Sequence, residues 1–202
     1  MKKVLCMLLC MVCLTGVMGC GGYKDASSDI PANWPTYAVS GMTFSCEAGW
    51  EAADISGFED AAVQPFQLLG TTDRVQWVNC LASPEWQTKT RNFLAISYQQ
   101  FQGTVEDSVL EEMLAGLSDI KSAFVSVNMT TSVLSSPSIA RYGKNTALTF
   151  ACRFTLEDGT QMIVRVGLVP HGDRLYQFHY VDYQMQENSQ FLAQVLTSLQ
   201  WN

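Results

Sequence analysis

Hydrophobic and polar residues alternate most regularly in the last third of the chain. Residues 148–156 alternate, an Asp-Gly pair follows at 158–159, and residues 162–168 alternate back. A period of two is typical of a β-strand with one buried face, and Asp-Gly fits the tight turn between paired strands. After a polar turn at 171–173, residues 175–181 are apolar on both faces. The pattern predicts a three-stranded meander covered on both sides.

Earlier segments carry further strand patterns. Residues 42–46 and 93–98 place apolar side chains on one face, which favours half-buried strands. Residues 66–70 and 74–81 flank a polar Thr-Thr-Asp sequence, and this arrangement predicts a hairpin. Residues 125–134 and 138–142 add one or two strands before the meander.

Two segments have the period of an amphipathic helix. Residues 105–124 repeat apolar side chains every three or four positions, with Thr104 as a candidate N-cap and an acidic start at Glu106 and Asp107. Residues 187–199 repeat the same pattern. Because a sheet buried on both faces needs cover on both faces, the sequence predicts an α+β domain, a mostly antiparallel sheet of about six strands flanked by helices.

The N-terminal residues follow neither period. A positive start at residues 1–3 precedes an almost wholly apolar run at 4–18, and Gly19 comes directly before Cys20. A run of about fifteen apolar residues suits a signal-peptide core and is short of the roughly twenty that span a bilayer. Residues 17–20 resemble the lipobox of bacterial lipoproteins, which implies cleavage before Cys20 and diacylglyceryl and palmitate chains on that residue. An uncleaved signal anchor is the alternative.

The sequence therefore divides into three parts. Residues 1–19 are predicted to be a lipoprotein signal peptide, residues 20–37 a lipidated tether rich in turn and linker residues, and residues 38–202 a globular domain. Since two acyl chains hold a protein stably, we expect a lipid-anchored protein on the extracytoplasmic face of the cell membrane, attached through Cys20.

Charge narrows the choice of partner. Without Lys2 and Lys3, ten basic residues stand against nineteen acidic ones, a net charge of about −9. Binding to nucleic acid needs a basic surface, so we expect no nucleic-acid partner. The same charge opposes close contact with anionic lipid headgroups and favours solubility of the domain.

Three cysteines remain in the predicted domain, at Cys46, Cys80 and Cys152. Export permits a disulfide, but three thiols cannot all pair, and each lies in an apolar segment where a buried free thiol is common. No Cys-x-x-Cys motif occurs after residue 19, so neither a redox motif nor a zinc knuckle is predicted. Whether any pair forms a disulfide stays open.

Recognisable catalytic chemistry is missing from the sequence. The two histidines fall in a predicted turn, at His171, and in a predicted strand, at His179, where a packed or edge histidine is the expectation. A metal site would need carboxylate ligands that the sequence does not place, so no metal is expected. No nucleophile elbow, Walker loop or dinucleotide fingerprint occurs, and we predict no catalytic residue and no cofactor.

Aromatic residues are the other candidates for a site. Of the five tryptophans, we expect Trp50 and Trp77 in the core. Trp86 lies in a Ser-Pro-Glu-Trp-Gln sequence between predicted strands and is the best candidate for an exposed binding contact.

The order of these elements resembles the PsbP-like fold, including its bacterial lipoprotein members. The resemblance rests on a strand that ends in a Gly-Trp turn at 49–50, a long central helix, the meander with Asp-Gly at its first turn, and a last helix followed by Ser-Leu-Gln-Trp. It covers roughly residues 38–202 and implies an α/β/α sandwich used as a binding or assembly module. No site residue of that family maps onto this chain.

Three functions follow as expectations. The first is a non-enzymatic, lipid-anchored binding or assembly module whose partner is the membrane, through Cys20, and an envelope protein or small ligand. The second is an exported hydrolase with an unrecognised active site. The third is a structural envelope component with no ligand. A cleft that brings His171 or His179 together with a carboxylate and a Ser or Cys would favour the hydrolase.

Overall fold

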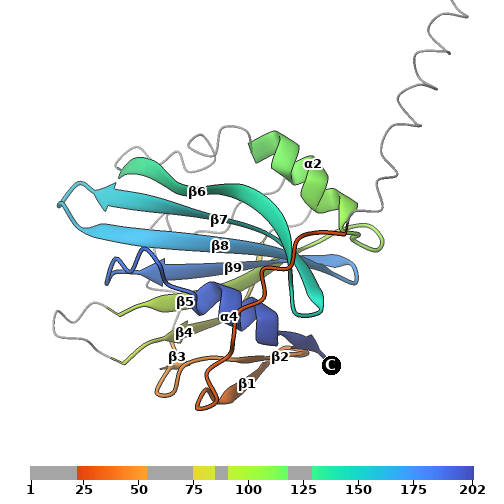
Figure 1. The fold of residues 1–202 in the computed structure, drawn as a ribbon, viewed down its shortest axis with the longest axis horizontal. Coiled ribbons are helices and arrows are strands. Elements are labelled where there is room, and N and C mark those ends of the chain that lie inside the picture. The colour runs from red at the N-terminus through yellow and green to blue at the C-terminus, as the bar shows by residue number, and fades with distance from the viewer. Residues whose placement is uncertain (1–21, 54–74, 85–90, 118–128) are drawn as a thin grey trace, which may run out of the picture.

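The structure is a computed structural model that describes residues 22–53, 75–84, 91–117 and 129–202 (Figure 1). The predicted signal peptide, Cys20 and Trp86 lie outside the described residues. So do residues 66–70 of the predicted hairpin and the last third of the predicted helix at 105–124.

A seven-stranded antiparallel sheet forms the centre of the domain (Figure 1). The meander appears as predicted: β7 (Asn145–Leu156), β8 (Gln161–His171) and β9 (Arg174–Asp182) are joined by tight turns, and β5 (Phe93–Gln100) pairs with residues 174–181 of β9. Of the predicted strand segments at 125–134 and 138–142, the described residues form one strand of this sheet, the edge strand β6 (Met129–Tyr142). In spatial order the strands are β3 (Glu51–Ala52), β4 (Gln76–Ala82), β5 (Phe93–Gln100), β9 (Arg174–Asp182), β8 (Gln161–His171), β7 (Asn145–Leu156) and β6 (Met129–Tyr142).

A second, small sheet brings the two ends of the domain together. It contains β1 (Thr36–Val39), β2 (Met42–Ser45) and β10 (Gln200–Trp201), with β2 in the middle. The expected number of about six strands is therefore too low, since the described residues hold seven strands in one sheet and three in another. A two-residue strand such as β10 has no periodic signal of its own, which is why the sequence pattern does not reveal this sheet.

In the described part of the chain, the helices are shorter than the sequence predicts. The described residues contain two helices, α2 (Ser108–Gly116) and α4 (Phe191–Ser198). The predicted start of the last helix at 187 is wrong because the backbone there has other partners: Arg165 Nη2 donates to the carbonyl oxygens of Gln186 and Glu187. Neither described helix is long and apolar enough to cross a membrane.

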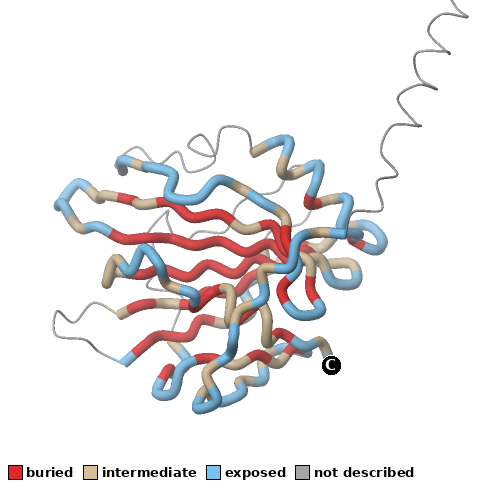
Figure 2. Tube along the Cα trace, in the orientation of Figure 1, coloured by how far each residue is buried: buried red, intermediate tan, exposed pale blue. Residues whose placement is uncertain are grey.

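Buried residues run along the central strands of the large sheet (Figure 2), and each face of the sheet has its own core. On one face α4 and the small sheet pack on residues such as Tyr176, Phe178 and Tyr180 of β9. On the other face α2 packs through Leu110 on the alternate residues of β7, β8 and β9. The prediction that β9 is apolar on both faces is confirmed, and among the described helices α4 covers one side of the sheet and α2 the other.

The three cysteines of the domain are free and buried. Cys80 on β4 and Cys152 on β7 share one face of the sheet, but β5, β9 and β8 lie between them. Four strand spacings of about 4.8 Å place these two backbones far beyond the roughly 7 Å that a disulfide spans. Cys46 belongs to the core on the opposite face. Burial raises the pKa of Cys46 and Cys80 to about 12 and that of Cys152 to about 11.

Candidate functional site

The two histidines, which the sequence offers only as weak candidates, occupy different environments. His179 is 1 % exposed, in the middle of β9 between Ala95 of β5 and Val166 of β8. His171 is exposed at the end of β8, and its ring stacks on the ring of Trp201 with centroids 4.1 Å apart and planes 3° apart. Neither histidine lines the pocket described next.

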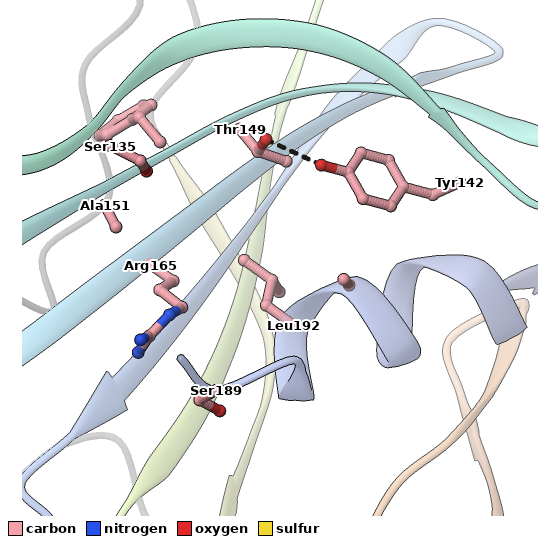
Figure 3. Close-up of a pocket in the computed structure, with 9 residues that line it drawn as sticks. Ser135, Tyr142, Thr149, Ala151, Arg165, Ser189 and Leu192 are labelled. Atoms are coloured by element: carbon pink, nitrogen blue, oxygen red, sulfur yellow. Dashed lines mark hydrogen bonds between the residues drawn. The ribbon is translucent and has the colours of Figure 1, made fainter. Parts of the chain in front are cut away.

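A pocket opens beside α4, over β6, β7 and β8 (Figure 3). Its volume is about 120 Å³. Gly167 explains why it forms beside α4 and not beneath it: a Cβ at this position would stand 3.0 Å from Leu196 Cδ1, so α4 packs closely on β8 at this point. The strands farther along the sheet, β7 and β6, then extend past the helix. The lining residues are Ser135, Tyr142, Thr149, Phe150, Ala151, Arg165, Ser189, Leu192 and Ala193.

Hydroxyl groups supply much of the polar lining of the pocket. Tyr142 and Thr149 face each other across the β6–β7 pair, with their oxygens 2.9 Å apart and hydrogen-bonded (Figure 3). Ser189 Oγ accepts the backbone N–H of Phe191 at the start of α4. Ser135 lies on β6 between two register shifts of the β6–β7 ladder. Each hydroxyl has both donor and acceptor capacity, so these groups can serve a polar ligand.

Arg165 contributes the only formal charge among the lining residues described here. Its side chain is 10 % exposed, and Nη1 lies 3.6 Å from Oδ2 of Asp182, whose side chain is fully buried. Nη2 donates to the carbonyl oxygen of Gln186 at 2.5 Å and to that of Glu187 at 2.8 Å. Burial lowers the pKa of Arg165, and the Asp182 carboxylate opposes that shift. Arginine stays charged in proteins, so the site holds a fixed, neutralised ion pair beside the pocket.

A second ion pair lies next to the first. Arg153 is on the same face of β7 as Ala151, and its Nη2 bonds to Oε1 of Glu187. Glu187 thus meets one arginine through its carboxylate and the other through its backbone carbonyl. The two arginines hold the chain before α4 against the sheet, and that segment forms one wall of the pocket.

A row of aromatic rings marks a different place, at the end of the sheet where β8 turns into β9. From His171 and Trp201 the row continues to Tyr176, 4.8 Å from Trp201, and to Tyr98, 5.6 Å from Tyr176. The guanidinium of Arg174 lies over Tyr98 at 4.4 Å, within cation–π range. Trp201 is fixed from behind, since its Nε1 donates to Asn145 Oδ1 at 2.8 Å.

Of the two tryptophans expected in the core, one is buried and the other is exposed. Trp50 is 5 % exposed and stacks on Phe191 with centroids 4.6 Å apart, so that prediction is confirmed. Trp77 is 38 % exposed, and its assignment to the core is wrong. The β4–β5 register shifts directly after Trp77, and α2 covers the distant strands β6 and β7. Trp86 lies outside the described residues.

Arg165 is the site residue that sequence reasoning missed. The signal was present: residues 162–168 alternate, and Arg165 stands among the alternate positions on the second face of a strand that is buried on both sides. A charge at such a position needs a partner, which is Asp182 in this fold. Ser135, Thr149 and Ser189 look like ordinary outward residues in the sequence and gave no such signal.

No metal-binding cluster was found in the described ranges: no three His, Cys, Asp or Glu side chains within them are placed to hold an ion. The described lining of the pocket also contains no histidine, cysteine or carboxylate. Its hydroxyls and its arginine can bind and orient a ligand, but they do not form a nucleophile–base pair.

Two solved structures have a similar fold. The solution structure of cyanobacterial PsbP (CyanoP) from Synechocystis sp. PCC 6803 is 12% identical, with a TM-score of 0.52, and the match covers 94% of this chain and 99% of that one. A crystal structure from Bacteroides thetaiotaomicron is also 12% identical, with a TM-score of 0.50 over 80% of this chain. The chain spans 45% of the length of that Bacteroides protein.

At this identity the two structures show the fold alone. No protein-family profile matches the chain, and no curated protein sequence matches it. The domain therefore has a fold similar to that of cyanobacterial PsbP, across nearly the whole length of both proteins.

Proposed function

We propose that this chain is a lipid-anchored, extracytoplasmic binding module, held through Cys20 and using the pocket beside α4 to take a small polar group. The lipobox-like residues 17–20 support the anchor. The similarity in fold to cyanobacterial PsbP is compatible with a binding or assembly role, although a fold alone assigns no function.

The pocket is the observation that carries this proposal. Its donors converge from three strands and the start of a helix, and Arg165, held by Asp182 and two backbone carbonyls, is already fixed before a ligand arrives. Pre-organisation of this kind lowers the entropic cost of binding. A volume of about 120 Å³ is small beside the roughly 300–1,000 Å³ of sites for drug-sized molecules. It suits a small polar molecule or a single projecting group of an envelope protein.

The alternative, an exported hydrolase, gains no support from the described part of the chain. His171 stacks on Trp201 at the end of the sheet, and His179 is buried inside it. Neither histidine reaches the pocket, whose described lining has no carboxylate or thiol.

Anchoring is tested on the intact protein expressed from its full sequence. Mass spectrometry of the membrane fraction should find a mature N-terminus at Cys20 with acyl chains attached. The Cys20→Ser variant should leave the membrane fraction. An unmodified N-terminus at Met1, or membrane association that survives Cys20→Ser, would contradict the lipid anchor and favour a signal anchor.

Binding is tested by thermal-shift screening of small polar compounds against the protein and the pocket-filling variant Ala151→Phe. A genuine pocket ligand should raise the melting temperature of the unaltered protein and leave that of Ala151→Phe unchanged. The matched control is Ala38→Phe, an equal enlargement at an exposed position of β1 away from the pocket. A ligand that stabilises all three proteins equally binds elsewhere and would refute the pocket.

A further inference from the structure

The segment from Tyr23 to Asp29, here called the strap, lies on the domain although the sequence assigns it to the tether. In Figure 1 it runs from the right-hand end of the sheet, beside α2, past α4 toward β1. At its first residue, the Tyr23 hydroxyl donates to Glu111 Oε1 in the first turn of α2, at 2.8 Å.

The strap next pairs with the end of the edge strand β6. Asp25 forms a parallel bridge with Arg141, in which Arg141 N donates to Lys24 O at 2.9 Å and Ala26 N donates to Arg141 O at 2.8 Å. The β6–β7 turn then binds the strap directly, since Gly143 N donates to Ser27 Oγ at 2.8 Å. These bonds add a short piece of chain to an edge that would otherwise present unpaired backbone groups there.

The strap continues over the outer side of α4. Ser28 donates its backbone N–H to Thr197 Oγ1 and its hydroxyl to Gln190 Oε1, so it contacts both ends of the helix. Gln194 Nε2 returns a bond to the carbonyl oxygen of Asp29 at 2.9 Å. The strap is thus fixed by α2, β6 and α4, three elements from distant parts of the sequence.

This fixation shortens the connection to the predicted anchor. Only Gly21 and Gly22 separate Cys20 from Tyr23. Fully extended chain spans at most about 3.6 Å per residue, so the Cα of Cys20 lies within about 11 Å of the Cα of Tyr23. A lipid on Cys20 then holds the domain close to the bilayer, because no long linker separates the two.

The position of Tyr23 decides which end of the domain is nearest the lipid. The β6–β7 turn, the β8–β9 turn and the start of α2 lie at this end, and Val105 N bonds to Gly172 O between the last two. The Asp-Gly turn at 158–159 lies at the other end of β7, a strand of twelve residues. At about 3.3 Å per residue the two ends of β7 are about 40 Å apart.

We infer that the strap sets the orientation of the domain on a lipid surface, with the β6–β7 turn facing the bilayer and the 158–159 turn facing away. This inference rests on the proposed lipidation of Cys20. Charge does not drive it, because exposed Lys24 and Lys144 at this end are balanced by exposed Glu106 and Asp107. The short covalent connection and the strap contacts determine the orientation.

The test places a donor fluorophore at either end of β7 in the lipidated full chain. Lys144→Cys and Asp158→Cys put one reactive thiol at each exposed turn, while the three native cysteines of the domain are buried and react slowly. Each labelled protein is inserted into phosphatidylcholine vesicles that carry an acceptor lipid. Strong energy transfer is expected from position 144, and loss of transfer from position 158. Equal transfer from both positions would overturn the inference.

A control changes only the connection. Twenty Gly-Ser residues inserted between Gly22 and Tyr23 keep the strap contacts and lengthen the reach, so the difference between the two labels should largely disappear. If the difference persists, direct contact with lipid and not the short connection sets the orientation, and the inference is wrong.

A separate measurement tests the strap without any lipid. In the Cys20→Ser chain, the amide hydrogens of Ala26 and Ser28 should exchange at least about tenfold more slowly than in an unstructured peptide. Amide exchange at the rate of an unstructured peptide would show that the strap does not pack on the domain. A protein found without acyl chains would overturn the anchor and the orientation together, while slow exchange would still identify the strap.

Discussion

Replacing Gly143 by alanine should destabilise the domain strongly, because this glycine lets the β6–β7 turn touch the last turn of α4. Gly143 has a φ of +59°, and a Cβ built on it would stand 2.4 Å from the carbonyl oxygen of Thr197. The left-handed backbone costs an alanine about 1–2 kcal/mol. Backbone cannot rotate away as a side chain can, so the overlap adds about 1–3 kcal/mol. The expected loss in the free energy of unfolding is about 2–5 kcal/mol.

The matched control is Gly172→Ala in the β8–β9 turn. Gly172 has almost the same φ, +61°, but nothing lies within 4 Å of the Cβ position. This variant should lose only the backbone cost of about 1–2 kcal/mol. Both are measured by urea unfolding of the Cys20→Ser chain, followed by circular dichroism. Equal losses for the two variants would refute the proposed contact between the turn and α4.

Three further predictions test the cores and the aromatic row. Phe191→Ala should lower the free energy of unfolding by about 3–5 kcal/mol, because the Phe191 ring lies among Trp50, Trp34 and Tyr180. Trp77→Ala, at a half-exposed position, should lower it by about 1 kcal/mol. Similar losses for the two variants in urea unfolding would contradict this packing. Burial raises the pKa of Cys46 to about 12, so its thiol should stay neutral at pH 8 and react with a thiol reagent only after the protein unfolds. Rapid labelling of Cys46 in the native protein would contradict this prediction. Burial lowers the pKa of His171 from its usual 6.5, so the unfolded chain binds the proton more readily than the folded one. The free energy of unfolding should therefore fall as the pH drops below 6.5. An NMR titration that places the His171 pKa above 6.5 would contradict this prediction.

The meander was predictable because two independent signals agree there. Alternation fixes which side chains share a face, and the Asp-Gly pair at 158–159 fixes where the chain reverses. Both faces of β9 are apolar in the sequence and buried in the structure, so the two-sided cover was predictable too. The start of α4 was not, because Arg165, some twenty residues earlier, takes the carbonyl groups of Gln186 and Glu187.

The candidate site depends on distances that no local pattern carries. Thr149 and Tyr142 meet only because the β6–β7 hairpin has a particular register, which two irregularities alter farther along. Ser189 reaches the pocket because α4 starts late. Arg165 alone had a sequence signal, a charge on the second face of a strand buried on both sides.

Strand β10 has a consequence for the time at which the domain becomes complete. Gln200 and Trp201 pair with Thr43 and Met42, so the small sheet closes only when two segments from opposite ends of the described domain have met. Contacts of such large sequence separation slow folding, because a long loop must close before they can form. Until β10 pairs, the domain also lacks the Trp201 indole that Asn145 binds. The pairing of β10 with β2 should therefore form late in folding, after the local strand pairs of the meander.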